Sequence, residues 1–205
     1  MQYQIAESFL SFQGEGIHLG RRAYFVRLFG CNVKCPWCDS KEAWLGEPKI
    51  KLTAEEILTE VLKSSAEIVV ITGGEPCLYD LRPLLTLLGK HNIATHLETS
   101  GTLEIKEDLQ AKFSWVALSP KPFMPAKESA LARADELKFI ISSEDDFAFC
   151  LDIATKATNA SALWLHPEWT KAQDYQLLSK IADFVSKNGG RWRCGYQVHK
   201  NYHAR

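Results

Sequence analysis

Three cysteines lie close together in a chain that has only six. Cys31, Cys35 and Cys38 form a C-x3-C-x2-C pattern, which lets one loop wrap three thiolates around a single inorganic centre. An iron–sulfur cube normally takes four cysteines, and no fourth cysteine lies nearby. The iron without a protein ligand would have an open coordination position, which is where metal centres do chemistry. We therefore expect an oxygen-sensitive 4Fe-4S cluster with one iron open to a ligand.

Two other uses of these cysteines remain open at this point. Three cysteines with a distant histidine or cysteine would make a structural zinc site, and Cys77 or Cys194 would complete an electron-transfer cluster. Zinc ligands usually come as two spaced pairs, and the sequence has no second pair. We expect Cys77, Cys150 and Cys194, which are scattered along the chain, to be small buried hydrophobes.

A glycine pair follows an apolar run in the segment Thr72-Gly73-Gly74-Glu75-Pro76. Because glycine has no Cβ and adopts positive φ, the backbone of such a loop can lie against a ligand. The N–H and C=O groups exposed there can hold a zwitterionic amino acid. A plain tight turn would also use two glycines, but the apolar residues 68–71 before the pair and the Glu-Pro after it favour a ligand-binding loop.

Short apolar runs alternate with helical stretches. Strands are predicted at residues 24–28, 68–71, 95–98, 115–118, 137–141, 162–165 and 193–198. Most of these runs are continuously apolar, as is typical of parallel strands covered by helices. The cysteines follow the first run, the glycine pair the second and Ser119-Pro120-Lys121 the fourth. Because the carboxyl ends of parallel strands open onto one face, we expect these motifs to converge on one site.

The helices between the strands carry start and stop signals. Helix starts are predicted at the capping box of Thr53 and Glu56, at Asp80 and at Ser143, where the helix would cover residues 144–157. An amphipathic helix is predicted over residues 170–188, ending at Gly189-Gly190. Strands that alternate with helices indicate an α/β fold with a mainly parallel sheet, and we expect a single domain, residues 1–205.

The composition sets limits on function. The chain has 205 residues, 46% hydrophobic and 24% charged, with a formal net charge of −1. This balance gives no long-range field for direct nucleic-acid binding. No apolar run reaches the length of a membrane span, and the first residues lack the basic start and apolar stretch of a secretory signal. We therefore expect a soluble, cytoplasmic protein with no membrane partner.

The spacing Cys31-x3-Cys35-x2-Cys38, together with Gly73-Gly74-Glu75-Pro76, resembles the radical S-adenosylmethionine (SAM) superfamily. The resemblance implies a partial, incomplete βα barrel of mainly parallel strands. It also implies that SAM chelates the open iron through its amino and carboxylate groups, and that one electron from the reduced cluster breaks a C–S bond to give a 5′-deoxyadenosyl radical. Carried over by position, the SAM-binding residues would be Trp37, Cys38, Asp39, Gly74, Glu98, Ser119, Pro120, Lys121 and His166.

Further motifs are similar to those of the 7-carboxy-7-deazaguanine synthase family. They include Phe12-Gln13-Gly14-Glu15-Gly16, Arg27, Cys38-Asp39-Ser40, Glu98-Thr99-Ser100-Gly101, Ser119-Pro120-Lys121 and Gln197-Val198-His199-Lys200. The resemblance implies a lyase that contracts 6-carboxy-5,6,7,8-tetrahydropterin to 7-carboxy-7-deazaguanine with loss of ammonia, toward queuosine-type bases in tRNA. Such enzymes use SAM catalytically and need Mg2+.

The same resemblance implies further ligands and partners. Ser40 would bind Mg2+, and the substrate would contact Phe12, Gln13, Gly14, Glu15, Arg27 and Thr72. A guanidinium such as that of Arg27 can hold a carboxylate through two hydrogen bonds, although a structural ion pair is the competing interpretation. No protein side chain is assigned a catalytic role of its own. The expected partners are an electron donor such as flavodoxin or ferredoxin and a second copy of the chain in a homodimer.

The chain departs from the family pattern at two places. His166-Pro167 stands where the family usually has Gln-Pro, and protonation of His166 would make SAM binding pH-sensitive. After Gln197-x-His199-Lys200 the chain continues to Arg205, where family members often end on a proline whose carboxylate meets the substrate. Two alternative functions remain at the sequence level: a radical SAM activating enzyme for a glycyl-radical protein, and a non-enzymatic zinc or electron-transfer module.

Overall fold

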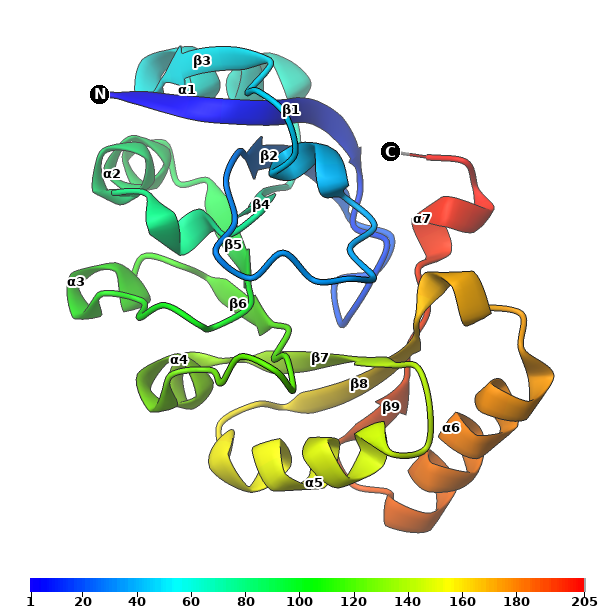
Figure 1. Ribbon diagram of the computed structural model, residues 1–205. Coiled ribbons are helices and arrows are strands. Elements are labelled where there is room, and N and C mark those ends of the chain that lie inside the picture. Colours follow the sequence, from blue (N-terminus) through cyan, green and yellow to red (C-terminus); the bar gives the residue numbers. More distant parts are fainter. Residues whose placement is uncertain (205) are drawn as a thin grey trace.

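A single nine-stranded sheet organises the computed structural model, which describes residues 1–204. Its strands are β1 (Gln2–Phe12), β2 (Arg22–Leu28), β3 (Ile50–Thr53), β4 (Ile68–Gly73), β5 (Ala94–Thr99), β6 (Trp115–Leu118), β7 (Glu136–Ile141), β8 (Ala162–Pro167) and β9 (Trp192–Cys194). Their order across the sheet is β3-β1-β2-β4-β5-β6-β7-β8-β9. Because β3 and β9 do not pair, the sheet is an incomplete barrel (Figure 1).

Most of the sheet is parallel, as predicted. Every pair from β2 to β9 runs parallel, whereas β1 pairs antiparallel with both β2 and β3. The sequence prediction missed β1 and β3. It also extended the last strand to residue 198, but β9 ends at Cys194. The chain leaves the sheet there because the Val198 N–H donates instead to the Gly14 carbonyl, at 3.0 Å.

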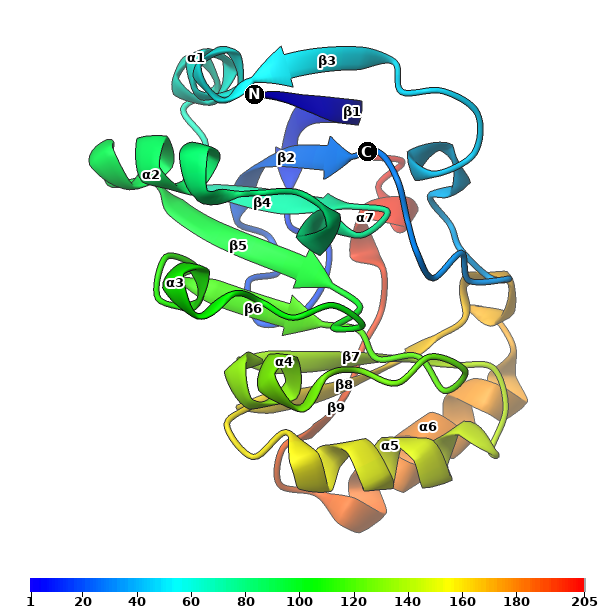
Figure 2. The same ribbon diagram turned by 60° about the vertical axis from the view of Figure 1, so that its left-hand side comes forward.

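Seven α-helices occur in the described residues: α1 (Ala54–Ser64), α2 (Arg82–Lys90), α3 (Glu107–Gln110), α4 (Glu128–Arg133), α5 (Asp146–Lys156), α6 (Tyr175–Asn188) and α7 (Val198–Asn201). Helices α1 to α6 lie on the outer side of the curved sheet (Figures 1 and 2). The loop after β2 lies on the opposite side. Among residues 1–204, no helix has the length and apolarity needed to cross a bilayer.

The helix signals were partly right. Thr53 and Glu56 form the predicted capping box, and Gly189 ends α6 with a φ of 56°. The predicted Asp80 start is close, since its carboxylate accepts the Arg82 N–H at 3.1 Å. Two helices start later than predicted. Ser143 Oγ accepts the Asp145 N–H at 3.3 Å, but α5 begins only at Asp146. Asp174 caps α6, which follows a short 3-10 turn at Trp169–Lys171.

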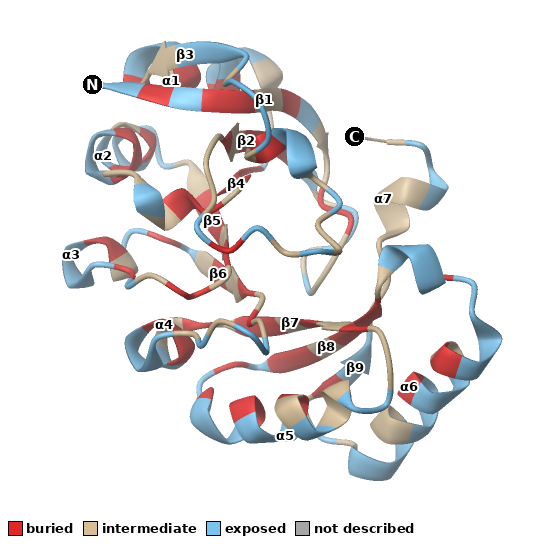
Figure 3. Ribbon diagram, in the orientation of Figure 1, coloured by how far each residue is buried: buried red, intermediate tan, exposed pale blue. Residues whose placement is uncertain are grey.

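The main hydrophobic core lies between the helices and the outer face of the sheet. Figure 3 shows buried residues along the strands and on the sides of the helices that face them. A second, small cluster of Phe9, Ala23, Phe25, Ile68 and Val70 lies away from this core. Polar residues at alternate positions on several strands face the inner side instead, where a cavity opens.

Candidate active site

A cavity of roughly 230 Å³ lies at the carboxyl ends of the parallel strands. Sixteen residues predicted to bind the cluster, SAM, Mg2+ or substrate line it: Phe12, Gln13, Gly14, Glu15, Arg27, Cys31, Cys35, Trp37, Cys38, Asp39, Ser40, Thr72, Gly74, Glu98, Ser119 and Lys121. The structure thus brings together motifs that are separated by more than a hundred residues in the sequence. Their meeting place follows from the common direction of β2, β4, β5 and β6.

The three clustered cysteines share this cavity, and the sulfur atoms of Cys31 and Cys38 accept hydrogen bonds. The backbone N–H groups of Val33 and Lys34 donate to Cys31 Sγ at 3.4 and 3.5 Å, and Trp44 Nε1 donates to Cys38 Sγ at 3.4 Å. Donors of this kind stabilise negative charge on sulfur and tune iron–sulfur centres. The donor set therefore fits an iron–sulfur cluster held by three thiolates.

None of the other three cysteines lines the cavity in the described chain. Burial raises the pKa of the Cys77 thiol to about 12, and Cys150 is fully buried. Cys194 is exposed, so the prediction that it would be buried was wrong, because β9 is an edge strand. Within residues 1–204, no group of three or more His, Cys, Asp or Glu side chains is gathered around a single-ion position, so the geometry gives no support to the zinc interpretation.

The glycine-pair loop packs directly against the start of the cysteine loop. The Gly74 N–H donates to the Leu28 carbonyl at 3.0 Å, and the Glu75 N–H donates to the Gly30 carbonyl at 2.8 Å. A Cβ at Gly74 would lie 2.1 Å from the Gly30 oxygen and 2.8 Å from Cys31 Cβ. Glycine is therefore required at this position, because the backbone of one loop rests on the backbone of the other.

Glu75 ties the glycine-pair loop to the end of β5. Its fully buried carboxylate accepts hydrogen bonds from Thr99 Oγ1 at 2.7 Å, from the Ser100 N–H at 2.9 Å and from Ser100 Oγ at 2.5 Å. The Cys77 N–H donates to it as well, at 3.1 Å. A buried carboxylate is stable only when its acceptor capacity is satisfied. Glu75 is therefore a structural residue that fixes two loops of the cavity wall.

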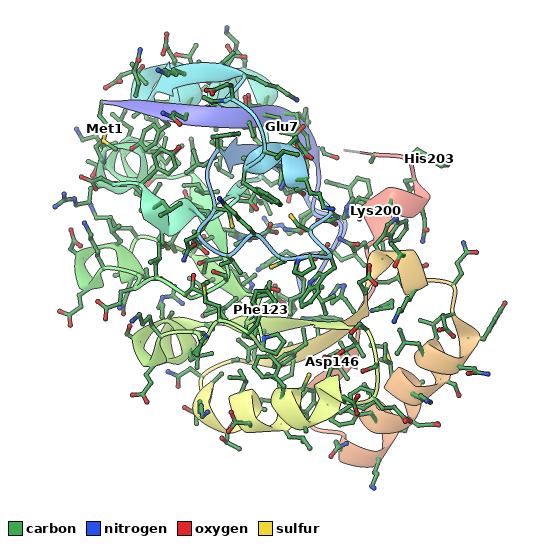
Figure 4. The ribbon with its side chains drawn as sticks, viewed as in Figure 1. Met1, Glu7, Phe123, Asp146, Lys200 and His203 are labelled. Atoms are coloured by element: carbon green, nitrogen blue, oxygen red, sulfur yellow. The ribbon has the colours of Figure 1, made fainter. Side chains whose placement is uncertain are left out.

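Lys121 forms a buried positive group close to the cysteines. Its ammonium donates to the Ser119 carbonyl at 2.5 Å and to Ser119 Oγ at 2.7 Å. Burial lowers the pKa of Lys121 to about 8, and the nearby Cys35 acts in the opposite direction. Beyond this strand end, Phe123 packs edge-on against Trp37 with ring centres 5.4 Å apart (Figure 4). This corner of the cavity combines a cation, a hydroxyl and an aromatic face.

Another part of the cavity wall is polar, and its side chains are joined by hydrogen bonds. Arg27 Nε donates to Glu7 at 2.8 Å, which fixes the guanidinium at the cavity wall. Both interpretations of Arg27 are therefore compatible with the structure, since it makes a structural ion pair and still faces the cavity. Gln13 donates to Glu98 at 3.0 Å and accepts the Glu15 N–H at 3.1 Å, so the segment after β1 is held against β5.

The C-terminal segment closes the site by bridging two carboxylates. Gln197 Nε2 donates to Glu15 and to Asp39, at 2.8 Å in each case. Lys200, labelled on α7 in Figure 4, donates to the same Asp39 oxygen at 2.6 Å and lies 4.5 Å from the ring centre of Trp169. Burial acts to raise the pKa of Asp39, but the hydrogen bonds from Lys200 and Gln197 hold it well below its usual range.

Two predicted SAM-binding residues, Pro120 and His166, are buried and do not line the cavity. Both His166 ring nitrogens are buried without a hydrogen-bond partner, and burial lowers the pKa of His166 to about 4. The ring therefore stays neutral near physiological pH, which removes the expected reason for pH-sensitive binding. Arg205, at the second departure from the family pattern, lies outside the described residues.

The sequence analysis missed several cavity residues, among them Trp44, Trp169 and Lys138. Trp44 and Trp169 carried no signal, because isolated tryptophans usually pack in cores. Lys138 did carry one, since it and Glu136 are charged residues in an otherwise apolar strand. Its partner Glu15 is 123 residues away in the sequence, so only the fold explains it.

Comparisons with known proteins agree with this geometry. The family model of the Radical SAM superfamily matches residues 26–154. The 7-carboxy-7-deazaguanine synthase of Synechocystis sp. is 39% identical over 98% of this chain and 92% of its own length. The enzyme of the same name from Flavobacterium psychrophilum is 37% identical over 96% of this chain and 90% of its own length.

A solved structure is similar as well. The crystal structure of QueE from Escherichia coli superposes with a TM-score of 0.79 at 32% identity, covering 97% of this chain and 95% of that one. The chain therefore belongs to the radical SAM superfamily and, within it, to the family of the 7-carboxy-7-deazaguanine synthases. The glycyl-radical activating enzyme and the non-enzymatic module have no counterpart among these relatives.

Proposed function

We propose that this chain is a radical SAM lyase that contracts 6-carboxy-5,6,7,8-tetrahydropterin to 7-carboxy-7-deazaguanine with loss of ammonia. One observation carries the proposal. A single cavity is lined by the three clustered cysteines and Gly74, and also by Arg27, Gln13 and Glu15. Curated synthases match nearly the whole chain.

The part of the cavity lined by the cysteines would hold the cluster and SAM. Cys31, Cys35 and Cys38 would bind the 4Fe-4S cluster, which supplies one-electron cleavage of SAM when both are bound. Backbone groups at Gly74 would receive the amino group of SAM, and Ser119 and Lys121 would flank its adenosyl part. Trp37 offers an aromatic face beside them. Asp39 and Glu98 complete this group of proposed SAM contacts.

The part of the cavity lined by Arg27 would hold the pterin. The Arg27 guanidinium, oriented by Glu7, would bind the substrate carboxylate through its remaining N–H groups. Phe12 packs edge-on against Tyr202 with ring centres 5.9 Å apart and would support the flat ring. Gln13, Gly14, Glu15 and Thr72 would contact the heteroatoms of the ring. The residues therefore bind and orient the substrate next to the cluster and keep water away.

Ser40 would bind Mg2+. Among the described residues, its side chain makes no capping hydrogen bond to the 3-10 turn that follows, and its hydroxyl donates to Asp39 over a long distance of 3.3 Å. It lines the same cavity as the cysteines and Arg27. Mg2+ typically takes few protein ligands and completes its octahedron with water and substrate oxygens, so one hydroxyl can suffice. The bound ion would polarise the substrate carboxylate.

The remaining expectations concern partners and location. We propose that an electron donor such as flavodoxin or ferredoxin reduces the cluster, and that the chain forms a homodimer in the cytoplasm. The unpaired edges of β3 and β9 are the places where a second copy would cover backbone groups.

The direct test is anaerobic turnover of the reconstituted protein with the tetrahydropterin, SAM, Mg2+ and a reductant. The expected product is 7-carboxy-7-deazaguanine, identified by mass and by its chromophore. Cys38→Ala should abolish turnover, because Cys38 lines the cavity. The matched control is Cys194→Ala, which changes an exposed cysteine outside the cavity and should stay active. Pterin that survives while the wild-type protein cleaves SAM would refute the substrate assignment.

A further inference from the structure

Strand β7 presents two opposite charges to the inner side of the sheet. Glu136 and Lys138 are two residues apart, so their side chains point to the same face. Both contact the segment that joins β1 to β2, residues 13–21. Glu136 holds the backbone of this segment, and Lys138 holds the carboxylate of Glu15. Neither β7 residue has a place in the function proposed above.

Glu136 anchors the segment beneath the cavity. Its carboxylate accepts Trp164 Nε1 at 2.7 Å, Trp115 Nε1 at 3.0 Å and the Ile17 N–H at 3.0 Å. Gly16 lies against it with a φ of 69°, and a Cβ there would lie 2.4 Å from a carboxylate oxygen. The backbone after Glu15 is therefore fixed by a buried acceptor with three donors.

Lys138 lines the cavity itself and pairs with Glu15 Oε2. The other Glu15 oxygen accepts Gln197 Nε2 at 2.8 Å. The Glu15 side chain is 10% exposed and that of Lys138 is 23% exposed. A lysine ammonium has three N–H donors, and Glu15 is the only hydrogen-bond acceptor recorded for this one among the described residues. The Glu15 carboxylate is thus held by Lys138 on β7 and by Gln197 in the C-terminal segment.

We propose that Lys138 is a positioning and specificity-determining residue, which orients the Glu15 carboxylate toward the substrate and offsets its charge. An unpaired carboxylate in this cavity would favour a cationic ligand. A carboxylate neutralised by Lys138 keeps free lone pairs and accepts hydrogen bonds from neutral N–H groups instead. The chemical class selected is a neutral heterocycle with N–H donors on its edge, so this inference rests on the proposed pterin substrate and deepens it.

The charges around Glu15 support this assignment. Burial acts to raise the pKa of Glu15, but Lys138, His166 and the hydrogen bond from Gln197 together outweigh burial, and the pKa falls to about 2, with Lys138 the largest of the lowering causes. Several charged or titratable groups face the Glu15–Lys138 pair. They are His166 on β8, His199 and Asp39 near the C-terminal segment, Glu98 on β5, Glu136 on β7 and Lys121 after β6. Burial lowers the pKa of both histidines, so neither supplies a lasting positive charge near neutral pH. Lys138 is therefore the cation that keeps Glu15 ionised.

The test compares Lys138→Met, Lys138→Arg and the matched surface control Lys63→Met in the reconstituted enzyme with SAM. Lys63 also pairs with a glutamate, but it is exposed on α1. We measure the KM and kcat for the tetrahydropterin, and the Kd of 6-carboxypterin, between about pH 5.5 and 8. Losing a charge-assisted hydrogen bond should raise the KM and Kd of Lys138→Met at neutral pH by about tenfold or more.

A pH effect separates positioning from a merely structural role. Without Lys138 the pKa of the buried Glu15 rises above its ordinary value, so the carboxylate becomes protonated as the pH falls and binding weakens further. The wild-type enzyme and Lys63→Met should show no such loss, and Lys138→Arg should restore most of the affinity. The double variant Glu15→Gln with Lys138→Met lacks the Glu15 carboxylate, so its Kd should not show the further rise at low pH that Lys138→Met shows.

Two results would overturn the inference. A Lys138→Met enzyme with the KM, Kd and pH profile of the wild type would show that Glu15 does not depend on the lysine. If Lys138→Met and Lys138→Arg lost affinity for the pterin equally, and the loss did not depend on pH, Lys138 would have only a packing role. If the wild type binds no pterin, the proposed function fails separately. Titration of Glu15 by carbon-13 NMR, assigned with Glu15→Gln, then still decides whether Lys138 keeps it ionised.

Discussion

Glu75 shows how one buried residue fixes the geometry of a site without touching a ligand. Its carboxylate accepts four hydrogen bonds from residues that end β4 and β5. Replacement by glutamine would turn one acceptor into a donor that faces the Ser100 N–H or the Thr99 hydroxyl. Leaving buried polar groups unsatisfied is costly, so Glu75→Gln should lower the free energy of unfolding by about 2–3 kcal/mol.

This prediction is checked by anaerobic urea unfolding. The control is Glu60→Gln, which removes an exposed ion pair with Lys63 on α1 and should change stability by less than about 0.5 kcal/mol. Equal effects of the two substitutions would contradict the structural role of Glu75.

His166 makes a separate prediction about pH. The folded protein holds the pKa of His166 at about 4, against about 6.5 in an unfolded chain. Because the unfolded state takes up the proton first, the neutral ring stabilises the fold fully above about pH 6.5, and that stability is lost as the pH falls toward 4. Over this window the wild type should lose about 3 kcal/mol more than His166→Gln.

The measurement is urea unfolding at a series of pH values. His96 has a lowered pKa as well, but it is unchanged in both proteins and cancels in the comparison. His91→Gln, at an exposed position after α2, is the control and should follow the wild type. Parallel curves for wild type and His166→Gln would contradict this prediction, because they would mean that the pKa of His166 is the same in the folded and unfolded protein.

At the scale of elements, the parallel strands were predictable and the antiparallel ones were not. Strands such as β4 and β8 are buried on both faces and read as continuous apolar runs. Strand β1 has a bulge between Ile5 and Glu7, which switches the buried face and destroys a simple alternation. Strand β3 is a short edge strand with no fully buried residue, so no pattern marked it.

Part of the candidate site could be predicted from the parallel strands, but not the contacts made by the C-terminal segment. Motifs at strand ends could be brought together because parallel strands end on one face. Contacts from the C-terminal segment could not be foreseen, because Gln197 reaches Glu15 across 182 residues and Asp39 across 158. Such contacts depend on how the chain returns to the barrel after β9, which no local pattern specifies.

The contact between two strand-end loops gives a prediction at this scale. Gly74→Ala would place a methyl group 2.1 Å from the Gly30 oxygen, so the cysteine loop must move. Displacements of about 1 Å in a catalytic arrangement can cost about 100-fold in rate, and we expect a loss of this order in turnover. SAM binding, measured by calorimetry on the reconstituted protein, should weaken in parallel.

Gly89→Ala is the matched control for this substitution. A Cβ at Gly89 in α2 would meet no atom within 4 Å, and alanine favours helices over glycine by up to about 1 kcal/mol. This variant should be slightly more stable and fully active. Equal activity of both alanine variants would contradict the close packing of the two loops.

At the scale of the whole molecule, loops rather than strand pairing close the barrel around the cavity. The sheet stays open between β3 and β9, while residues 13–15 and the C-terminal segment meet across the inner side. The cysteine loop is a third segment, and it covers the carboxyl ends of the strands (Figure 2). The cysteines and Arg27 therefore line one cavity, in which the proposed cofactor and the proposed substrate would lie side by side.

The most direct test of this account is the ratio of product to SAM under anaerobic conditions, with the tetrahydropterin in large excess over SAM. If both molecules occupy the one cavity and SAM is used catalytically, many molecules of 7-carboxy-7-deazaguanine should form per SAM, and the SAM should be recovered intact. Stoichiometric accumulation of 5′-deoxyadenosine with unchanged pterin would contradict the account.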